Sequence, residues 1–366
     1  MTHPKDEIYY GPLHAERCSA TKQVKSDIKY IAHSFFLMIF VIFLITLFIT
    51  RSNQSEKKFI AIDGVFWSEE AEALYPTVEK QHISLLRKVP TLEFDRLESG
   101  CGRMQNRKAI SKENDVYCIR YRQNLDQIQG DIMSYYLSLL LGLTNIPTSA
   151  LYKVQFSNSS HSRNATKEMS SANWKEGKIG VIAEVIANLS DVNIPQYMLS
   201  PPYLLTQSTI NSSLSQDDVR FLMQWSDLIL FDYITGNLDR VASSLINKQW
   251  NANIMQKPIH NLQRGGNGLL VFFDNEAGLF HSYRLLDKYQ SHHEYLLHSI
   301  CVFRRKTILN IEKLAVKDAA HEIYSNLVAS DPHGKHLPNL PSKNRAILNT
   351  RLDNVLKHVE ECKVAT

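Results

Sequence analysis

The stretch Asp227-Leu-Ile-Leu-Phe-Asp-Tyr-Ile-Thr-Gly-Asn-Leu-Asp-Arg240 decides how the chain is interpreted, together with Leu269-Leu-Val-Phe-Phe-Asp-Asn-Glu-Ala-Gly-Leu279. Each stretch is an apolar run that ends in acidic residues beside a glycine, a pattern that directs a charge from the core toward a cleft. Two such carboxylates, Asp239 and Asp274, favour phosphoryl transfer, in which one acid orients a hydroxyl and the other holds a metal. We therefore expect both acids to converge on one nucleotide cleft.

An apolar run divides the 366-residue chain near its amino terminus. Phe35 to Ile49 is apolar apart from Thr46, and Tyr30 to Thr50 extends it to the about 20 residues that a membrane-spanning helix needs. The basic head and the missing cleavage site favour a signal anchor over a cleaved signal peptide. A buried core helix is the weaker alternative, because the run has no polar face. We predict a cytosolic tail over 1–29, a transmembrane helix over 30–50, a stem over 51–63 and a lumenal remainder.

Glycosylation signals and cysteines support a lumenal location for the remainder. Five Asn-X-Ser/Thr sequons follow the apolar run. Their asparagines are Asn53, Asn158, Asn164, Asn188 and Asn211. Four cysteines also follow it, an even number that an oxidising compartment would pair. The favoured pairing is Cys101–Cys118 with Cys301–Cys362, although four cysteines allow three pairings.

Two arginines and an acid form a candidate phosphate-binding group. Val116 to Arg122 is predicted to be a strand on which Arg120 and Arg122 share one face. This face is either a solvated basic surface or a pair that contacts phosphate. A helix follows over Gln127 to Leu141, and Asp131 at the edge of its apolar stripe is either solvated or paired with Arg120.

The rest of the lumenal chain is predicted to be mainly helical. Lys153 to Trp174, rich in Ser, Asn and Lys, is expected to be a loop or glycosylated insertion. A long helix capped near Ser215 runs through Phe231, and we interpret its Asp227 and Asp232 as structural. Further helices are expected over 285–328 and 342–362.

Several of these stretches resemble the Four-jointed family of Golgi kinases over most of residues 64–305. The matching text is Gly64-Val-Phe-Trp-Ser68, Cys101-Gly-Arg-Met-Gln-Asn-Arg107, Arg120-Tyr-Arg122, Asp126-Gln-Ile-Gln-Gly-Asp131, Ser134-Tyr-Tyr-Leu137, Asp227 to Arg240, Phe273-Asp-Asn-Glu-Ala-Gly-Leu279 and Cys301-Val-Phe-Arg304. The resemblance implies an α+β, two-lobed protein-kinase-like fold with a β-rich amino lobe over 64–190 and a mainly helical lobe over 191–366. It also implies a single-pass type II Golgi membrane protein with a lumenal kinase domain, and a cleaved, secreted form.

The resemblance further implies an ATP-dependent Ser/Thr kinase that uses Mg or Mn. The implied substrates are cadherin repeats of atypical cadherins in planar cell polarity, and no nucleic acid is expected as a partner. Carried over by position, Asp239 would be the catalytic acid, and Asp274 would hold the metal. Glu276 or Asn237 would supply a second metal ligand. Arg120, or else Arg122, would contact phosphate, with Asp131 as the acid that pairs with it.

The chain also departs from typical protein kinases. It lacks the G-x-G-x-x-G loop and the His-Arg-Asp motif, and Ser244 stands five residues after Asp239, where a metal-binding Asn is usual. Two alternatives therefore stay open: a kinase of glycan hydroxyls, and a pseudokinase that binds without turnover. Retention of both Asp239 and Asp274 argues against the pseudokinase. That both acids merely end structural turns is a further, less favoured interpretation.

Overall fold

The computed structural model describes residues 33–49, 64–75, 79–156, 161–199, 204–210 and 214–365. The chain divides into two compact units, Met1–Lys57 and Lys58–Thr366. In the first unit the described residues form one helix over 33–49. Among the described residues no helix is long and apolar enough to cross a membrane, which corrects the prediction for 30–50. The predicted tail over 1–29 and the predicted stem over 51–63 lie outside the described residues.

The second unit contains a five-stranded antiparallel sheet with the order β1-β2-β3-β5-β4. Its strands are β1 (Phe94–Ser99), β2 (Arg107–Ser111), β3 (Val116–Arg120), β4 (Ser149–Lys153) and β5 (Ile179–Glu184). A smaller sheet of three strands has the order β6-β7-β8. These strands are β6 (Ser190–Asp191), β7 (Leu262–Arg264) and β8 (Leu270–Phe272).

Helices cover both faces of the five-stranded sheet. They are α3 (Glu79–Lys88), α4 (Leu125–Leu141) and α5 (Arg163–Ser171). Because successive strand residues point to opposite faces, Val181 of β5 packs in the core with α4, while Ile182 packs in a separate apolar cluster with α3 and α5. The sheet thus presents one face to α4 and the larger core.

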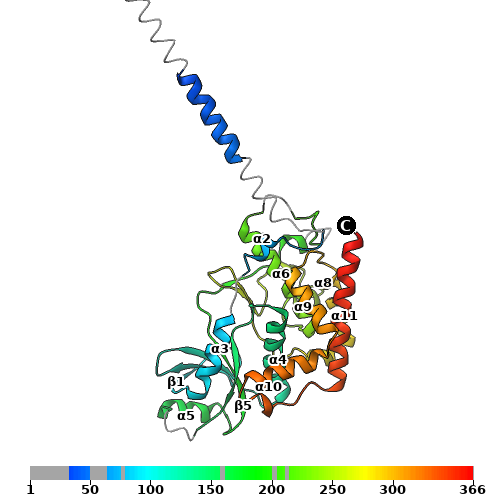
Figure 1. Ribbon diagram of the computed structural model, residues 1–366. Coiled ribbons are helices and arrows are strands. Elements are labelled where there is room, and N and C mark those ends of the chain that lie inside the picture. Colours follow the sequence, from blue (N-terminus) through cyan, green and yellow to red (C-terminus); the bar gives the residue numbers. More distant parts are fainter. Residues whose placement is uncertain are drawn as a thin grey trace, which may run out of the picture. The chain divides into compact units, whose positions relative to one another are not determined.

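The remaining helices build the larger core around α6 (Gln216–Thr235), which is buried along most of its length. They are α2 (Glu69–Glu72), α7 (Val241–Asn247), α8 (Leu286–Leu297), α9 (Arg305–Ala315), α10 (Ala319–Ser330) and α11 (Ser342–Ala365). Figure 1 shows the five-stranded sheet with α5 at one end of this unit and α6, α8 and α9 toward the other. A β-rich part and a helical part therefore meet within one compact unit, as an α+β kinase-like fold requires.

Most predicted helices are present, and one predicted loop is not. Ser215 caps α6 with a reciprocal capping box, and Gly142 ends α4 in the left-handed conformation that favours glycine. The stretch Lys153 to Trp174 was expected to be irregular, but it contains α5, which Ser162 caps. The reason is packing: α5 buries its apolar side in the cluster that covers β1.

Candidate active site

A cavity of about 820 Å³ is bordered by both sheets. Its apolar wall follows β5 and the segment after it, and includes Ala183, Val185, Ile186, Leu189 and Ile259. Its charged wall includes Lys108, Arg120 and Asp274. An apolar wall with a few convergent charges, at this volume, suits a ligand of nucleotide size.

Three charged residues from distant parts of the chain meet here, and two of them, Arg120 and Asp274, line the cavity. Arg120, at the end of β3, has its Nη1 3.3 Å from Oδ1 of Asp131 on α4 and 3.4 Å from Oδ1 of Asp274 after β8. Burial alone would lower the pKa of Arg120, but the carboxylates of Asp131, Asp274 and Glu276 outweigh it and raise that pKa. Burial raises the pKa of Asp131, and the charge of Arg120 offsets part of that rise. Arg120 is therefore a permanent cation that faces two acids.

The segment from Asp274 to Glu276 sends its two carboxylates in different directions. Asp274 has a φ of 54°, a left-handed conformation that is uncommon outside glycine, and its side chain keeps 26% exposure. Glu276 is buried, and Arg122 contacts its Oε2 through Nε at 2.7 Å and Nη2 at 2.6 Å. Gln127 and Arg103 contact its Oε1 at 3.1 and 3.0 Å. Asp274 is thus open to a ligand, whereas both oxygens of Glu276 are already engaged.

The loop after α6 carries the other candidate acid. Gly236 ends the helix with a φ of 70°, and the side-chain oxygen of Asn237 then accepts the backbone N–H of Asp239 at 2.8 Å. Asn237 is buried, and its Nδ2 has no hydrogen-bond partner among the residues that the structure describes. This leaves one buried donor beside Asp239 for an additional acceptor.

Arg240 joins this loop to the segment after β8. Its guanidinium is fully buried and pairs with Asp232 of α6. Its Nη1 also donates to the carbonyl of Phe273 at 2.7 Å and to Oδ1 of Asn275 at 3.1 Å. The residues on either side of Asp274 are therefore held by Arg240, through the backbone of Phe273 and the side chain of Asn275.

Asp239 borders a second cavity, of about 390 Å³. Arg103, Gln127 and Glu276 also line this cavity, but Asp274 does not. The two acids expected in a single cleft therefore line two adjoining cavities, and the segment 274–276 forms part of the wall of each. Asp274 faces one cavity, and Glu276, two residues later, faces the other.

Close backbone contact fixes this wall against α4. A Cβ at Gly130 would lie 2.3 Å from the carbonyl oxygen of Glu276 and 2.9 Å from that of Gly278. Only a residue without a side chain lets α4 approach the segment so closely. Asp131, the next residue of α4, is thereby placed beside Asp274.

The four cysteines of this unit form the favoured pairs, Cys101–Cys118 and Cys301–Cys362. Cys101 and Cys118 line the larger cavity, whereas the second pair lies near the carboxyl terminus. Of the sequon asparagines, Asn164 and Asn188 are exposed. Asn53, Asn158 and Asn211 lie outside the described residues.

Sequence reasoning assigned no role to three residues that hold the site. Arg103 and Gln127 engage Glu276, and Arg240 joins the two acidic loops. The one available signal was Arg240, a cation five residues after the end of the apolar helix that contains its partner Asp232. Arg103 lies in the turn between β1 and β2, whose position depends on the tertiary fold.

Comparison with known proteins gives a consistent set of similarities. The Four-jointed box protein middle domain matches residues 80–365. The Drosophila melanogaster protein "Extracellular serine/threonine protein kinase four-jointed" is 36% identical over 85% of this chain and 62% of its own length, so the chain spans less than two thirds of that relative. "Four-jointed box protein 1" of Homo sapiens is 36% identical over 86% of this chain and 74% of its length. The crystal structure of the Golgi casein kinase with Mn and ADP bound aligns with a TM-score of 0.50 and 12% identity, covering 78% of this chain and 77% of that one, which shows a shared kinase-like fold.

Proposed function

This chain belongs to the Four-jointed box family, and from that premise we propose that it is a kinase that transfers the γ-phosphate of ATP to serine and threonine hydroxyls of secreted and cell-surface proteins. One observation carries the proposal. Arg120, Asp131 and Asp274 come from a strand, a helix and a loop that are distant in sequence. Arg120 contacts both acids, and together with Asp274 it lines a cavity large enough for a nucleotide. Cadherin repeats are the acceptors we propose first.

The described side chains fit a nucleotide with a divalent cation. Asp274 offers carboxylate oxygens, the ligands that hard cations such as Mn²⁺ and Mg²⁺ prefer, and its contact with Arg120 is long, at 3.4 Å. Such a cation, when bound, neutralises charge on the phosphates. We assign Glu276 a structural role in the segment 274–276 and not that of a metal ligand, because Arg122, Arg103 and Gln127 contact both of its carboxylate oxygens.

The chain's own residues divide the remaining tasks. Arg120 supplies a fixed positive charge to the phosphates, and Asp131 holds its guanidinium in place. Asp239, on the smaller cavity, accepts the proton of the acceptor hydroxyl at its carboxylate and orients that hydroxyl. The side-chain oxygen of Asn237 holds the backbone N–H of Asp239, and its Nδ2 can donate a hydrogen bond to a bound ligand. In this assignment the larger cavity binds the nucleotide, the smaller one admits the acceptor hydroxyl, and transfer takes place where the two cavities adjoin at the segment 274–276.

The location of the activity follows from the two disulfides. Such bonds persist in oxidising compartments, which favours the secretory pathway or the cell exterior. The name of the Drosophila melanogaster relative, which describes an extracellular kinase, supports the same location.

The test is transfer of radiolabelled γ-phosphate from ATP by the full chain to a cadherin-repeat array, with Mn²⁺ or Mg²⁺. Asp239→Asn should keep nucleotide affinity and lose transfer by about 10²–10⁴-fold, whereas Asp274→Ala should lose both. Asp95→Asn, an exposed acid on β1, is the matched control and should behave as the unmodified chain does. Phosphate on sugar and none on protein would favour a glycan kinase. Nucleotide binding without transfer to either acceptor would favour a pseudokinase.

A further inference from the structure

Three potential metal ligands lie together near the carboxyl terminus, apart from both cavities. They are His298, the residue that ends α8, and His358 and Glu361 on α11. Nε2 of His298 is 4.0 Å from Oε2 of Glu361, and Nδ1 of His358 is 3.8 Å from the same oxygen. One ligand atom from each residue lies within 4.8 Å of the others.

Hydrogen bonds to backbone carbonyls fix which nitrogen of each imidazole carries a proton. Nδ1 of His298 is 2.7 Å from the carbonyl oxygen of Glu294, and Nε2 of His358 is 2.8 Å from that of Ile300. A carbonyl only accepts, so these nitrogens are the donors. The other nitrogen of each neutral ring therefore keeps its lone pair, and in both rings it is the nitrogen that faces Glu361. Metal-binding histidines in proteins are oriented by the same kind of second hydrogen bond.

His358 is the strongest sign that this cluster takes a ligand. Its side chain is only 6% exposed, and its Nδ1 has no hydrogen-bond partner among the described residues. A buried lone pair left without a donor is costly unless a proton or a cation satisfies it.

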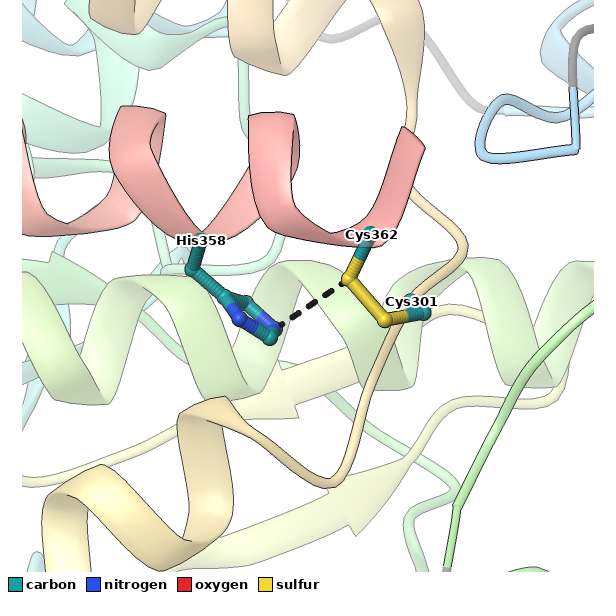
Figure 2. Close-up of side chains that lie close together, drawn as sticks. All are labelled: Cys301, His358 and Cys362. Atoms are coloured by element: carbon teal, nitrogen blue, oxygen red, sulfur yellow. Dashed lines mark hydrogen bonds between the residues drawn. A yellow bond between two sulfur atoms is a disulfide. The ribbon is translucent and has the colours of Figure 1, made fainter. Parts of the chain in front are cut away.

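The disulfide between Cys301 and Cys362 holds the cluster together. Figure 2 shows the ring of His358 beside this disulfide, and its Nε2 is 3.5 Å from Sγ of Cys362. Cys301 follows Ile300, whose carbonyl accepts from His358, and Cys362 follows Glu361. The covalent bond therefore holds the residue next to Glu361 beside the residue that follows Ile300, whose carbonyl accepts from His358.

We propose that His298, His358 and Glu361 bind a divalent transition metal, with Zn²⁺ preferred, and leave its fourth position to water. Two imidazoles and one carboxylate are a common ligand set for Zn²⁺ with an open position. Tetrahedral Zn²⁺ with bonds of about 2.0–2.1 Å holds its ligands about 3.3 Å apart. The side chains of His298 and Glu361 are 57% and 51% exposed, so they can close the remaining gap by rotation.

Among the described residues, one lysine contacts Glu361 and would compete with a metal for it, but only weakly. Nζ of Lys357 is 3.7 Å from Oε1 of Glu361, and its side chain is 77% exposed. Exposed pairs of this kind contribute little, so a metal would displace Lys357 readily. The site differs in kind from Asp274, where oxygen ligands suit Mn²⁺ or Mg²⁺.

The test is calorimetric titration of the full chain with zinc chloride, with excess Mn²⁺ present to occupy other oxygen-ligand sites. We expect one Zn²⁺ per chain at this site, and His298→Gln and Glu361→Gln should each weaken it by at least about 10–100-fold. His321→Gln and Glu360→Gln, which change exposed neighbours of the same types, are the matched controls and should bind as the unmodified chain does. Both test positions are exposed, so unfolding of the variants is not expected, and their melting temperatures without zinc check this. Absence of zinc binding, or equal affinity in test and control variants, would overturn the proposal.

Discussion

Replacing Arg240 with methionine tests whether the two acidic loops depend on one buried cation. The substitution keeps an unbranched side chain and removes the contacts to Asp232, Asn275 and the carbonyl of Phe273. Asp232 would then be a buried carboxylate without its cation. Removing one partner of a buried ion pair costs about 3–5 kcal/mol, mostly because the remaining charge stays desolvated. We therefore expect Arg240→Met to lower the free energy of unfolding by about that amount.

The measurement is urea unfolding followed by circular dichroism, with the free energy extrapolated to zero denaturant. A lower midpoint with an unchanged slope would show lost stability rather than a changed unfolded state. Arg264→Met is the matched control, because Arg264 pairs with Asp217 at a site where the two side chains are 28% and 59% exposed. An exposed pair contributes about 0–1 kcal/mol, so this variant should differ little from the unmodified chain.

A double variant separates the pair from its surroundings. Asp232→Leu with Arg240→Met removes both charges, and the cost should fall below the sum of the single variants by about 0.5–3 kcal/mol. Two results would refute the reasoning: a loss in Arg240→Met no larger than in Arg264→Met, or strictly additive losses in the double variant. Phosphate transfer by Arg240→Met should also fall more than nucleotide affinity, because Asp239 loses its support.

Three further outcomes are expected. Burial lowers the pKa of His293 to about 3, so its contribution to stability is complete above pH 6.5 and is lost as the pH falls toward 3. Between pH 8 and pH 5 this residue alone should lower the free energy of unfolding by about 2 kcal/mol, and His293→Phe should reduce the measured pH dependence by that amount. A disulfide that closes a longer loop removes more conformational entropy from the unfolded chain, and the two disulfides close sequence separations of 61 and 17. Calorimetry should therefore show the free energy of unfolding reduced by about 4 kcal/mol in Cys301→Ser and by about 3 kcal/mol in Cys101→Ser, and equal reductions would contradict this reasoning. Gly130→Ala should displace the wall at Glu276 and weaken nucleotide binding, whereas Ala346→Gly on α11 should leave binding unchanged.

The helices were predictable where apolar periodicity and end signals agreed. Ser215 and Gly142 are such signals, and both act as expected at the ends of α6 and α4. Helix α5 was not predictable, because its exposed residues are mostly Ser, Asn and Lys, and only Ala165 and Met169 are buried. Tertiary packing against β1 decided its conformation, and composition carried no sign of that contact.

For the site, sequence located the acids but not their directions. Asp239 and Asp274, each near the end of an apolar run, both line cavities. Of the two alternatives for Asp131, solvated or paired with Arg120, the structure has the pair. The left-handed backbone at Asp274 and the four contacts to Glu276 depend on residues from three other segments. No local pattern encodes such contacts, so the division into two cavities could not be foreseen.

Two buried acids of α6, Asp227 and Asp232, connect this helix to two different parts of the chain. Asp227 pairs with Arg304 at 2.8 Å and accepts from Thr307 at the start of α9, while Asp232, five residues later, pairs with Arg240. The two carboxylates leave the helix in different directions, so α6 connects the α9 region with the loop that carries Asp239. Buried ion pairs add little net stability compared with apolar contacts of the same shape. Their consequence here is geometric, because the buried Arg240 contacts both the helix that precedes Asp239 and the residues beside Asp274, and so connects the two acidic segments.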